Sequence, residues 1–181
     1  DQQSNKDTPG YFGHIELSVP VFHVQYFPLV QKLVRCVCYR CAAQLHPGND
    51  VERDPRRRLN YMVEQSKKVK KCPVCEAVQP DKFVKTDLCK MHALWPAATV
   101  NDVLIEESKL DMTPKYVLNL FKQLSDDTIT ALGLNPKLSH PSWMIMEVFP
   151  VCPPSCRPSV HQDNGQRMED DITIKYCDII K

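Results

Sequence analysis

The sequence lacks several features that would place it in a common functional class. Five glycines among 181 residues stand against fifteen prolines, so we expect stiff, extended connections rather than flexible linkers. No apolar run approaches the roughly 18 residues of a membrane span, and the first residues do not resemble a signal peptide, so no membrane partner is expected. A phosphate-binding glycine loop, a G-x-S-x-G motif and a catalytic Cys–His pairing are also missing. We therefore predict no catalytic residues.

The composition is that of a folded domain kept under reducing conditions. Hydrophobic residues make up 43% and charged residues 25%, and the net charge of +1 does not mark a nucleic-acid binder. Nine cysteines, an odd number without a secretory signal, argue against a complete disulfide framework and favour metal ligands or buried thiols.

Hydrophobic periodicity predicts short strands and helices in an α+β arrangement. Alternation over residues 15–22 predicts an edge strand, because Pro20 cannot donate to a ladder. Thr113 and Pro114 form a capped helix start. The other expected elements are helices over 28–37, 59–69, 125–133 and 169–181, strand in 82–96, a buried strand over 143–148 and a polyproline-like path over 150–158.

Two C-x2-C knuckles carry the strongest chemical signal. Cys38 and Cys41 form the first knuckle and Cys72 and Cys75 the second, with 30 residues between them. A knuckle presents two thiolates on one turn, each able to lie about 2.3 Å from a tetrahedral ion. Four cysteines leave no open coordination position, so we predict one structural zinc.

Other cysteines compete with this assignment. Cys89-x2-His92 offers two ligands in place of one knuckle, although alternation around it also fits a half-buried strand. Cys36 falls on the apolar face of the helix before the first knuckle and is expected to pack there. We also expect burial of the isolated cysteines Cys152, Cys156 and Cys177.

Basic residues gather between the knuckles. Residues 53–71 contain eight Lys or Arg and two acids, a local charge of +6. Such a run either contacts phosphates or is a solvated loop. The candidate nucleic-acid-binding residues are Arg56, Arg57, Arg58, Lys67, Lys68, Lys70 and Lys71.

The densest acidic cluster is not a magnesium site. Neighbouring residues on a helix point in different directions, so Glu169, Asp170 and Asp171 do not converge on one ion. Their position at a helix start is explained by the helix dipole. That helix has no stop signal before Lys181, and the chain starts with Asp1 rather than Met, so we expect a fragment or a processed chain.

Four stretches of the sequence carry recognisable motifs and together cover nearly the whole chain. They are residues 9–23 (PGYFGHIEL and PVFH), 33–41 (LVRCVCYRC), 132–160 (LGLNP, PSWMI and RPSV) and 169–175 (EDDITIK). In this order they resemble the largest subunit of eukaryotic-type multisubunit DNA-dependent RNA polymerases, closest in character to RNA polymerase II.

The resemblance implies the N-terminal clamp region of that subunit, a mobile module that closes over DNA and the RNA–DNA hybrid. It implies an irregular, zinc-stapled α+β domain over 1–181, with a zinc-binding part at about 27–95 and the start of the clamp coiled coil at about 168–181. Its partners would be the second-largest and other subunits, and transcription factors at the coiled coil. The polymerase transfers nucleotides from NTPs with magnesium held by an NADFDGD loop, which does not occur in this chain.

The chain departs from the family near its start, in the length between the knuckles, and at Cys152 and Cys156. The family has Cys-Pro-Gly-His where this chain has Thr8, Pro9, Gly10 and Tyr11, so a second zinc is expected to be missing. This divergence is compatible with a protist or a large DNA virus, and hence with a location in the nucleus, in a viral factory or in the virion.

The alternative to the polymerase interpretation is a stand-alone zinc-containing nucleic-acid-binding module. A RING-type domain, a further alternative, would need eight ligands for two zinc ions.

Overall fold

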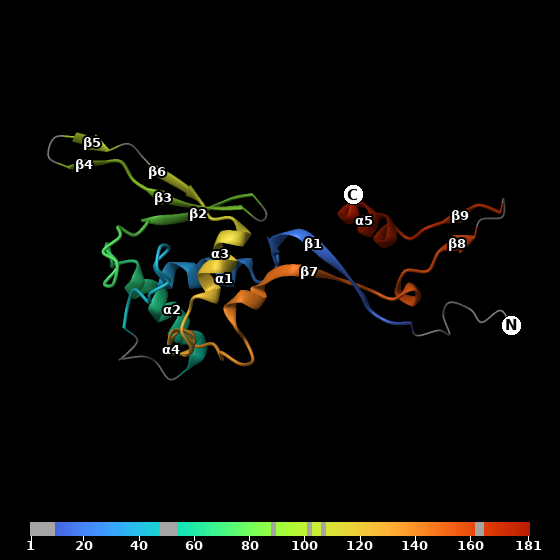
Figure 1. The fold of residues 1–181 in the computed structure, drawn as a ribbon, viewed down its shortest axis with the longest axis horizontal. Helices are drawn as coiled ribbons and strands as arrows, with labels where there is room; N and C mark the ends of the chain where they lie inside the picture. The colour runs from blue at the N-terminus through green and yellow to red at the C-terminus, as the bar shows by residue number, and fades with distance from the viewer. Residues whose placement is uncertain (1–9, 48–53, 88–89, 101–102, 106–107, 162–164) are drawn as a thin grey trace. The chain divides into compact units, whose positions relative to one another are not determined.

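The computed structural model describes residues 10–47, 54–87, 90–100, 103–105, 108–161 and 165–181 (Figure 1). It confirms a mixed α+β fold of short elements. The chain divides into two compact units, Val19–Met146 on the one hand, and Asp1–Ser18 with Glu147–Lys181 on the other. Among the described residues no helix is long and apolar enough to cross a membrane.

Helices build most of the core of the larger unit. They are α1 (Phe27–Cys36), α2 (Pro55–Ser66), α3 (Pro114–Lys122), α4 (Asp126–Ala131) and the 3-10 turn η1 (Pro141–Met144). Apolar residues at helical spacing place one face of each longer helix in a common cluster, as expected from an amphipathic pattern. Fully buried members of this cluster include Val30, Leu33, Val34, Met62, Val117, Phe121, Ile129 and Leu132.

The helix starts predicted from Thr113 and Ser125 are confirmed. Thr113 Oγ1 accepts a hydrogen bond from the backbone N–H of Tyr116 at 3.2 Å, and Ser125 Oγ accepts one from Thr128 at 3.3 Å. These bonds satisfy backbone donors that a helix leaves free in its first turn. Gly133 follows α4 with a φ of +84°, the left-handed conformation that glycine adopts without strain.

A three-stranded antiparallel sheet packs on these helices. Its order is β2 (Lys82–Asp87), β3 (Lys90–Trp95) and β6 (Ser108–Asp111), with Ala93 paired to Phe83 on one side and Leu110 on the other. The strand expected in residues 82–96 is thus a hairpin of two strands. A further hairpin, β4 (Ala98–Val100) with β5 (Val103–Ile105), was not predicted.

A two-stranded sheet pairs β1 (Gly13–Phe22) with β7 (Ile145–Val151), which confirms the first strand. The buried strand expected over 143–148 is only partly right. Trp143 lies in η1 and is 62% exposed, and Val148 is 48% exposed. A two-stranded sheet has little around it to bury its side chains, so Glu147, Val148 and Pro150 of β7 are exposed and only Ile145 is buried.

The smaller unit contains η2 (Pro154–Cys156), β8 (Val160–His161), β9 (Arg167–Met168) and α5 (Asp171–Ile180). The polyproline path expected over 150–158 is interrupted by η2. Burial of the isolated cysteines was also wrong for two of the three, since Cys156 and Cys177 are exposed and Cys152 is half-buried. The physical reason is that Cys156 ends a short surface turn, and Cys177 lies on a helix with no buried residue.

Candidate metal centre

The two C-x2-C knuckles have the same backbone design. In the first, the N–H of Cys38 donates to the carbonyl of Ala43 at 2.8 Å, and the N–H of Ala42 donates to the carbonyl of Cys38 at 3.0 Å. The second repeats this pattern thirty-four positions later, with Cys72 bonded to Ala77 at 2.9 Å and Glu76 to Cys72 at 3.0 Å. Each knuckle is closed by an isolated antiparallel bridge, Val37 with Gln44 and Lys71 with Val78.

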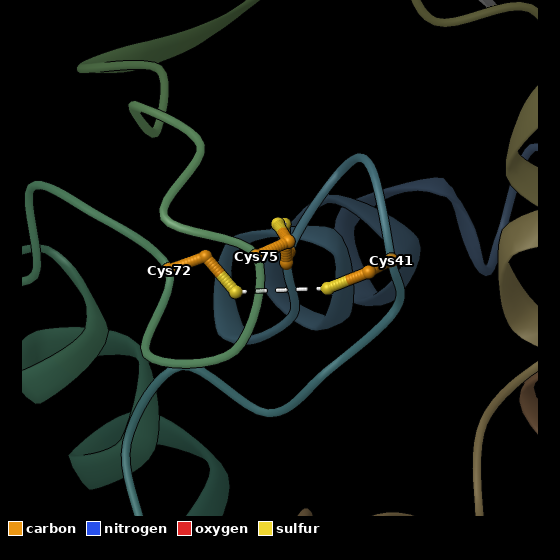
Figure 2. Close-up of side chains that lie close together, drawn as sticks. Cys41, Cys72 and Cys75 are labelled. Atoms are coloured by element: carbon orange, nitrogen blue, oxygen red, sulfur yellow. Dashed lines mark hydrogen bonds between the residues drawn. The ribbon is translucent and has the colours of Figure 1, made fainter.

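The four thiols meet at one point, as the spacing predicted. The Sγ atoms of Cys38, Cys41, Cys72 and Cys75 all lie within 4.8 Å of one another. Figure 2 shows Cys41 and Cys72 facing each other across the gap between the knuckles, at a separation of 3.6 Å, and Cys38 lies 3.6 Å from Cys75. Two thiolates that are each 2.3 Å from a tetrahedral ion are separated by about 3.8 Å. The arrangement therefore fits a four-cysteine zinc ion.

Residues distant in sequence hold the two knuckles together. The Trp95 ring contacts Tyr39 of the first knuckle edge-on, with ring centroids 5.2 Å apart. Its indole N–H donates to the carbonyl of Val78 behind the second knuckle, at 3.0 Å. The Tyr116 hydroxyl of α3 donates to the carbonyl of Tyr39. The site is thus fixed to the sheet and to the helical core.

Burial and backbone donors act in opposite directions on the thiols. Burial raises the pKa of Cys38, and it raises the pKa of Cys41 to about 12. Burial also acts against ionisation of Cys72, but it is outweighed by hydrogen bonds from the backbone N–H groups of Cys75 and Val74 together with those from the thiols of Cys41 and Cys75, and the pKa of Cys72 is lowered to about 7. Ionisation of all four groups requires a cation between them, since thiolates in such a cluster repel one another.

The competing ligands are arranged differently. His92 Nδ1 lies 2.6 Å from a carboxylate oxygen of Asp111 on the neighbouring strand, and Cys89 lies outside the described residues. Cys36 is fully buried in the helical core, as predicted, and the Sγ–H donates to the carbonyl of Lys32 at 3.3 Å. Of the two positions where the family's second zinc would have ligands, Tyr11 is 94% exposed and Thr8 lies outside the described residues.

The candidate basic residues separate into two groups at opposite ends of α2. Arg57 and Arg58 lie in its first turns, and Lys67 to Lys71 follow its last residue, Ser66, and lead into Cys72. A rise of 1.5 Å per residue puts roughly 14 Å between Arg57 and Ser66. The lysine group alone therefore adjoins the cysteine cluster. The side chain of Arg56 lies outside what the structure describes.

Several of these cations have polar partners. Lys67 pairs with Glu64 at 2.6 Å and Lys70 with Asp81 at 2.8 Å, while Lys68 donates to Gln65 at 3.1 Å. Arg57 pairs with Asp54, and Arg58 donates to the carbonyl of Thr130 at 3.2 Å, which ties it to α4. The lysines between Lys67 and Lys71 nevertheless keep their ammonium groups at an exposed surface.

Besides Trp95 and Tyr116, sequence reasoning missed a residue that contacts one of the four thiols directly. The side-chain amide of Gln79, four residues after Cys75, donates to Cys38 Sγ at 3.3 Å. Nothing in its local sequence marks it, because the contact joins positions 41 residues apart.

Comparison with known proteins agrees with the motifs. The family model described as RNA polymerase Rpb1, domain 1, matches residues 1–181. A DNA-directed RNA polymerase II subunit RPB1 from Euplotoides octocarinatus is 32% identical over 197 aligned residues, covering 99% of this chain and 41% of that protein. The DNA-directed RNA polymerase subunit Rpo1N of Methanothermobacter thermautotrophicus is also 32% identical, over 97% of this chain and 20% of that protein.

The chain thus spans less than half the length of either relative. The four sequence stretches, the matched family and both relatives point to the same part of the same subunit. The chain belongs to the RNA polymerase Rpb1, domain 1 family, the N-terminal region of the largest polymerase subunit.

Proposed function

We propose that this chain is a zinc-stiffened clamp element that helps a DNA-directed RNA polymerase to hold DNA and the RNA–DNA hybrid. The observation that carries the proposal is the closed four-cysteine cluster, continuous with an exposed lysine segment, in a chain matched end to end by the Rpb1 domain. The catalytic carboxylates and their magnesium would be supplied by the remainder of the polymerase.

Zinc held by Cys38, Cys41, Cys72 and Cys75 would be structural. A four-thiolate ion leaves no position for water or substrate, and its binding free energy contributes directly to folding. The ion would join two loops that otherwise share few apolar residues, since the cluster here has Cys38, Leu45 and Cys72 as its buried members and only Ala43 and Val69, besides the other two ligands, packed against them. Zinc would therefore give the lysine segment beside Cys72 a fixed position.

The lysine segment is the proposed nucleic-acid contact. Lys67, Lys68 and Lys71 are exposed, and Lys71 is adjacent to the ligand Cys72. Phosphate contacts by such residues are independent of base sequence, which suits an element that must hold any template. The arginine group at the other end of α2 would meet a different part of the nucleic acid or another subunit.

The domain boundaries and the partners are proposed from the resemblance to the family. The zinc-binding part would cover about 27–95, and α5 would start the clamp coiled coil at about 168–181. The partners would be the second-largest and other subunits, with transcription factors at the coiled coil. Of the expected locations, the relative named as an RNA polymerase II subunit supports the nucleus.

DNA binding as a function of salt tests the lysine segment. The triple variant Lys67→Gln, Lys68→Gln, Lys71→Gln removes three charges without touching the pair between Lys70 and Asp81. Log Kd should change less steeply with log salt concentration, by about 0.9 for each phosphate that is no longer neutralised. Fluorescence anisotropy with a labelled duplex and with an RNA–DNA hybrid measures both slopes.

A matched control removes three exposed charges elsewhere in the same unit. Lys109→Gln, Lys115→Gln, Lys137→Gln lowers the net charge equally, but it should leave the salt slope close to that of the unaltered chain. Equal slopes for both triple variants would return the lysine segment to the solvated-loop interpretation. Failure of the chain to bind the second-largest subunit of the polymerase would instead favour a stand-alone zinc module.

A further inference from the structure

An apolar groove lies on the larger unit where α1, α2 and the turn after α4 meet (Figure 1). Its volume is about 350 Å³, at the low end of the range of about 300–1,000 Å³ for ligand sites, so it has room for one or two side chains of a bound segment. Gly133, which follows α4, contributes no side chain to fill this space. The floor and walls are leucines from three separate segments: Leu29, Leu59, Leu132 and Leu134.

These leucines belong to the helical core rather than to an isolated surface patch. Leu132 is fully buried and Leu59 is 9% exposed, so these two side chains form the floor of the groove. Leu29 and Leu134 are only partly buried and pack against the same cluster, so they form its walls. A bound apolar side chain would therefore contact residues whose positions are already fixed by packing.

Lys32 on α1 is the charged residue of the lining, and it is exposed. Its ammonium group donates to Asn60 Oδ1 on α2 at 3.0 Å, and the acceptor is a neutral amide. In the part of the chain that the structure describes, no carboxylate pairs with Lys32. A lysine side chain can lay its methylene stem along apolar neighbours and keep its charge at the rim. The groove thus combines an apolar floor with a positive charge that no carboxylate neutralises.

Two arginines add to the positive charge at this rim. Arg57 precedes Asn60 by three residues, so the two side chains are neighbours on the surface of α2. Arg58 donates to the carbonyl of Thr130 at 3.2 Å, which places it beside the end of α4 that leads into Leu132.

The acidic residues of this region are engaged or distant. Asp54 lies 3.8 Å from Arg57, and Glu64 lies 2.6 Å from Lys67. Two further acids occupy the first turn of α4, a helix of six residues, so they lie roughly 8 Å from the end that lines the groove. The rim of the groove is therefore positive overall.

We propose that this groove docks a short acidic segment of a partner protein, with a large apolar side chain on the leucines and a carboxylate beside Lys32. The leucines favour an aliphatic or aromatic side chain, and the positive rim favours Asp or Glu next to it. A nucleic acid fits less well, because the residues that line the groove include no aromatic ring on which a base could stack. The proposal involves neither the cysteine cluster nor the lysine segment, so it goes beyond the clamp function proposed above and can be tested independently of it.

Peptide titration of the full chain, followed by NMR of isotope-labelled leucine methyl groups, tests the docking. The probe is a short peptide in which one leucine is flanked by aspartate and glutamate residues. One matched peptide has serine in place of this leucine, and another has lysine in place of every acid. We expect only the acidic leucine peptide to shift the methyl resonances of Leu29 and Leu134, while those of Leu110 on β6 stay unchanged.

Substitution of Lys32 tests the charge, and it alters an exposed side chain outside the buried core. Lys32→Gln removes one exposed ion pair with the peptide and should weaken its binding by about 1.5-fold to 5-fold. Lys115→Gln, which removes an exposed charge from α3 instead, should leave the affinity unchanged. Lys32→Glu should bind the acidic peptide more weakly still, and should bind the lysine peptide more tightly than the unaltered chain does. Unchanged resonances elsewhere in the same spectra show that each variant is folded.

Three results would overturn the proposal. The first is an absence of shifts at Leu29 and Leu134 with the acidic leucine peptide, and the second is equal binding of the acidic and lysine peptides. The third is a DNA duplex that shifts the same methyl groups, which would assign the groove to nucleic acid. Salt-dependent DNA binding by the lysine segment bears only on the clamp function, so the two proposals can fail separately.

Discussion

Ala42 and Glu76 have the same backbone φ of +57°, and each directly follows the second cysteine of its knuckle. This left-handed conformation turns the chain so that the next residue can accept the N–H of the first cysteine. Residues other than glycine adopt it at a cost of about 1–2 kcal/mol. Both knuckles therefore contain local strain, and the contacts around the cluster must offset it.

Glu76→Gly should relieve this strain at one knuckle. The side chain is exposed, so its removal loses little packing, and the free energy of unfolding should rise by about 1 kcal/mol. Urea unfolding at a fixed zinc concentration measures the change. Glu64→Gly is the matched control, because glycine inside α2 should instead lower the stability by about 0.5–1 kcal/mol. A loss of stability at both positions would show that the strain is absent.

Local signals in the sequence were sufficient to predict that the four cysteines cluster. A C-x2-C knuckle is a single turn, so its residue types and spacing already specify where the two thiols point. The helix starts at Thr113 and Ser125 were predictable for the same reason, since a cap and its helix are adjacent in sequence.

Interactions between distant residues could not be predicted in this way. The position of Trp95, between Tyr39 of one knuckle and the carbonyl behind the other, depends on the sheet that carries it. The donor Gln79 depends on how the two knuckles meet. The exposure of Cys156 was misjudged because the tendency of free cysteine to be buried holds only where a core is available to receive it.

Metal stoichiometry should follow the four clustered cysteines. Cys38→Ser and Cys75→Ser each remove a ligand, so zinc content should fall well below one ion per chain, and the fold should lose stability because zinc binding contributes to folding. Native mass spectrometry measures the content. Cys156→Ser, an exposed cysteine in the other unit, is the control and should retain one zinc. Two zincs in the unaltered chain would show that the ligand assignment is incomplete.

Thiol reactivity should rank the cysteines by burial. Burial raises the pKa of Cys36 to about 12, so the thiol stays protonated below that pH, and at pH 8 only on the order of one molecule in ten thousand carries the thiolate. Alkylation at pH 8 should therefore modify the exposed Cys156 and Cys177 first and Cys36 only on unfolding. Peptide mass spectrometry after timed quenching gives the order. Early modification of Cys36 in the folded chain would contradict its placement in the core.

The acidic cluster before α5 should prove structural rather than catalytic. Asp170 caps the helix, with Oδ1 accepting the backbone N–H of Ile172 at 2.8 Å, and Asp171 occupies the first turn, where a negative charge interacts favourably with the helix dipole. Asp170→Ala should destabilise α5 by about 1 kcal/mol, seen as faster hydrogen exchange across Asp171–Ile180. Asp178→Ala removes an exposed acid whose ion pairs with Lys175 and Lys181 are long, at 4.0 and 3.8 Å, and should have a smaller effect.

With template, NTPs and magnesium, we expect no RNA from the isolated chain, because polymerisation requires carboxylates that converge on the metal ions. Template-dependent synthesis that disappears in Asp170→Ala would reverse this assignment and make the cluster part of an active site.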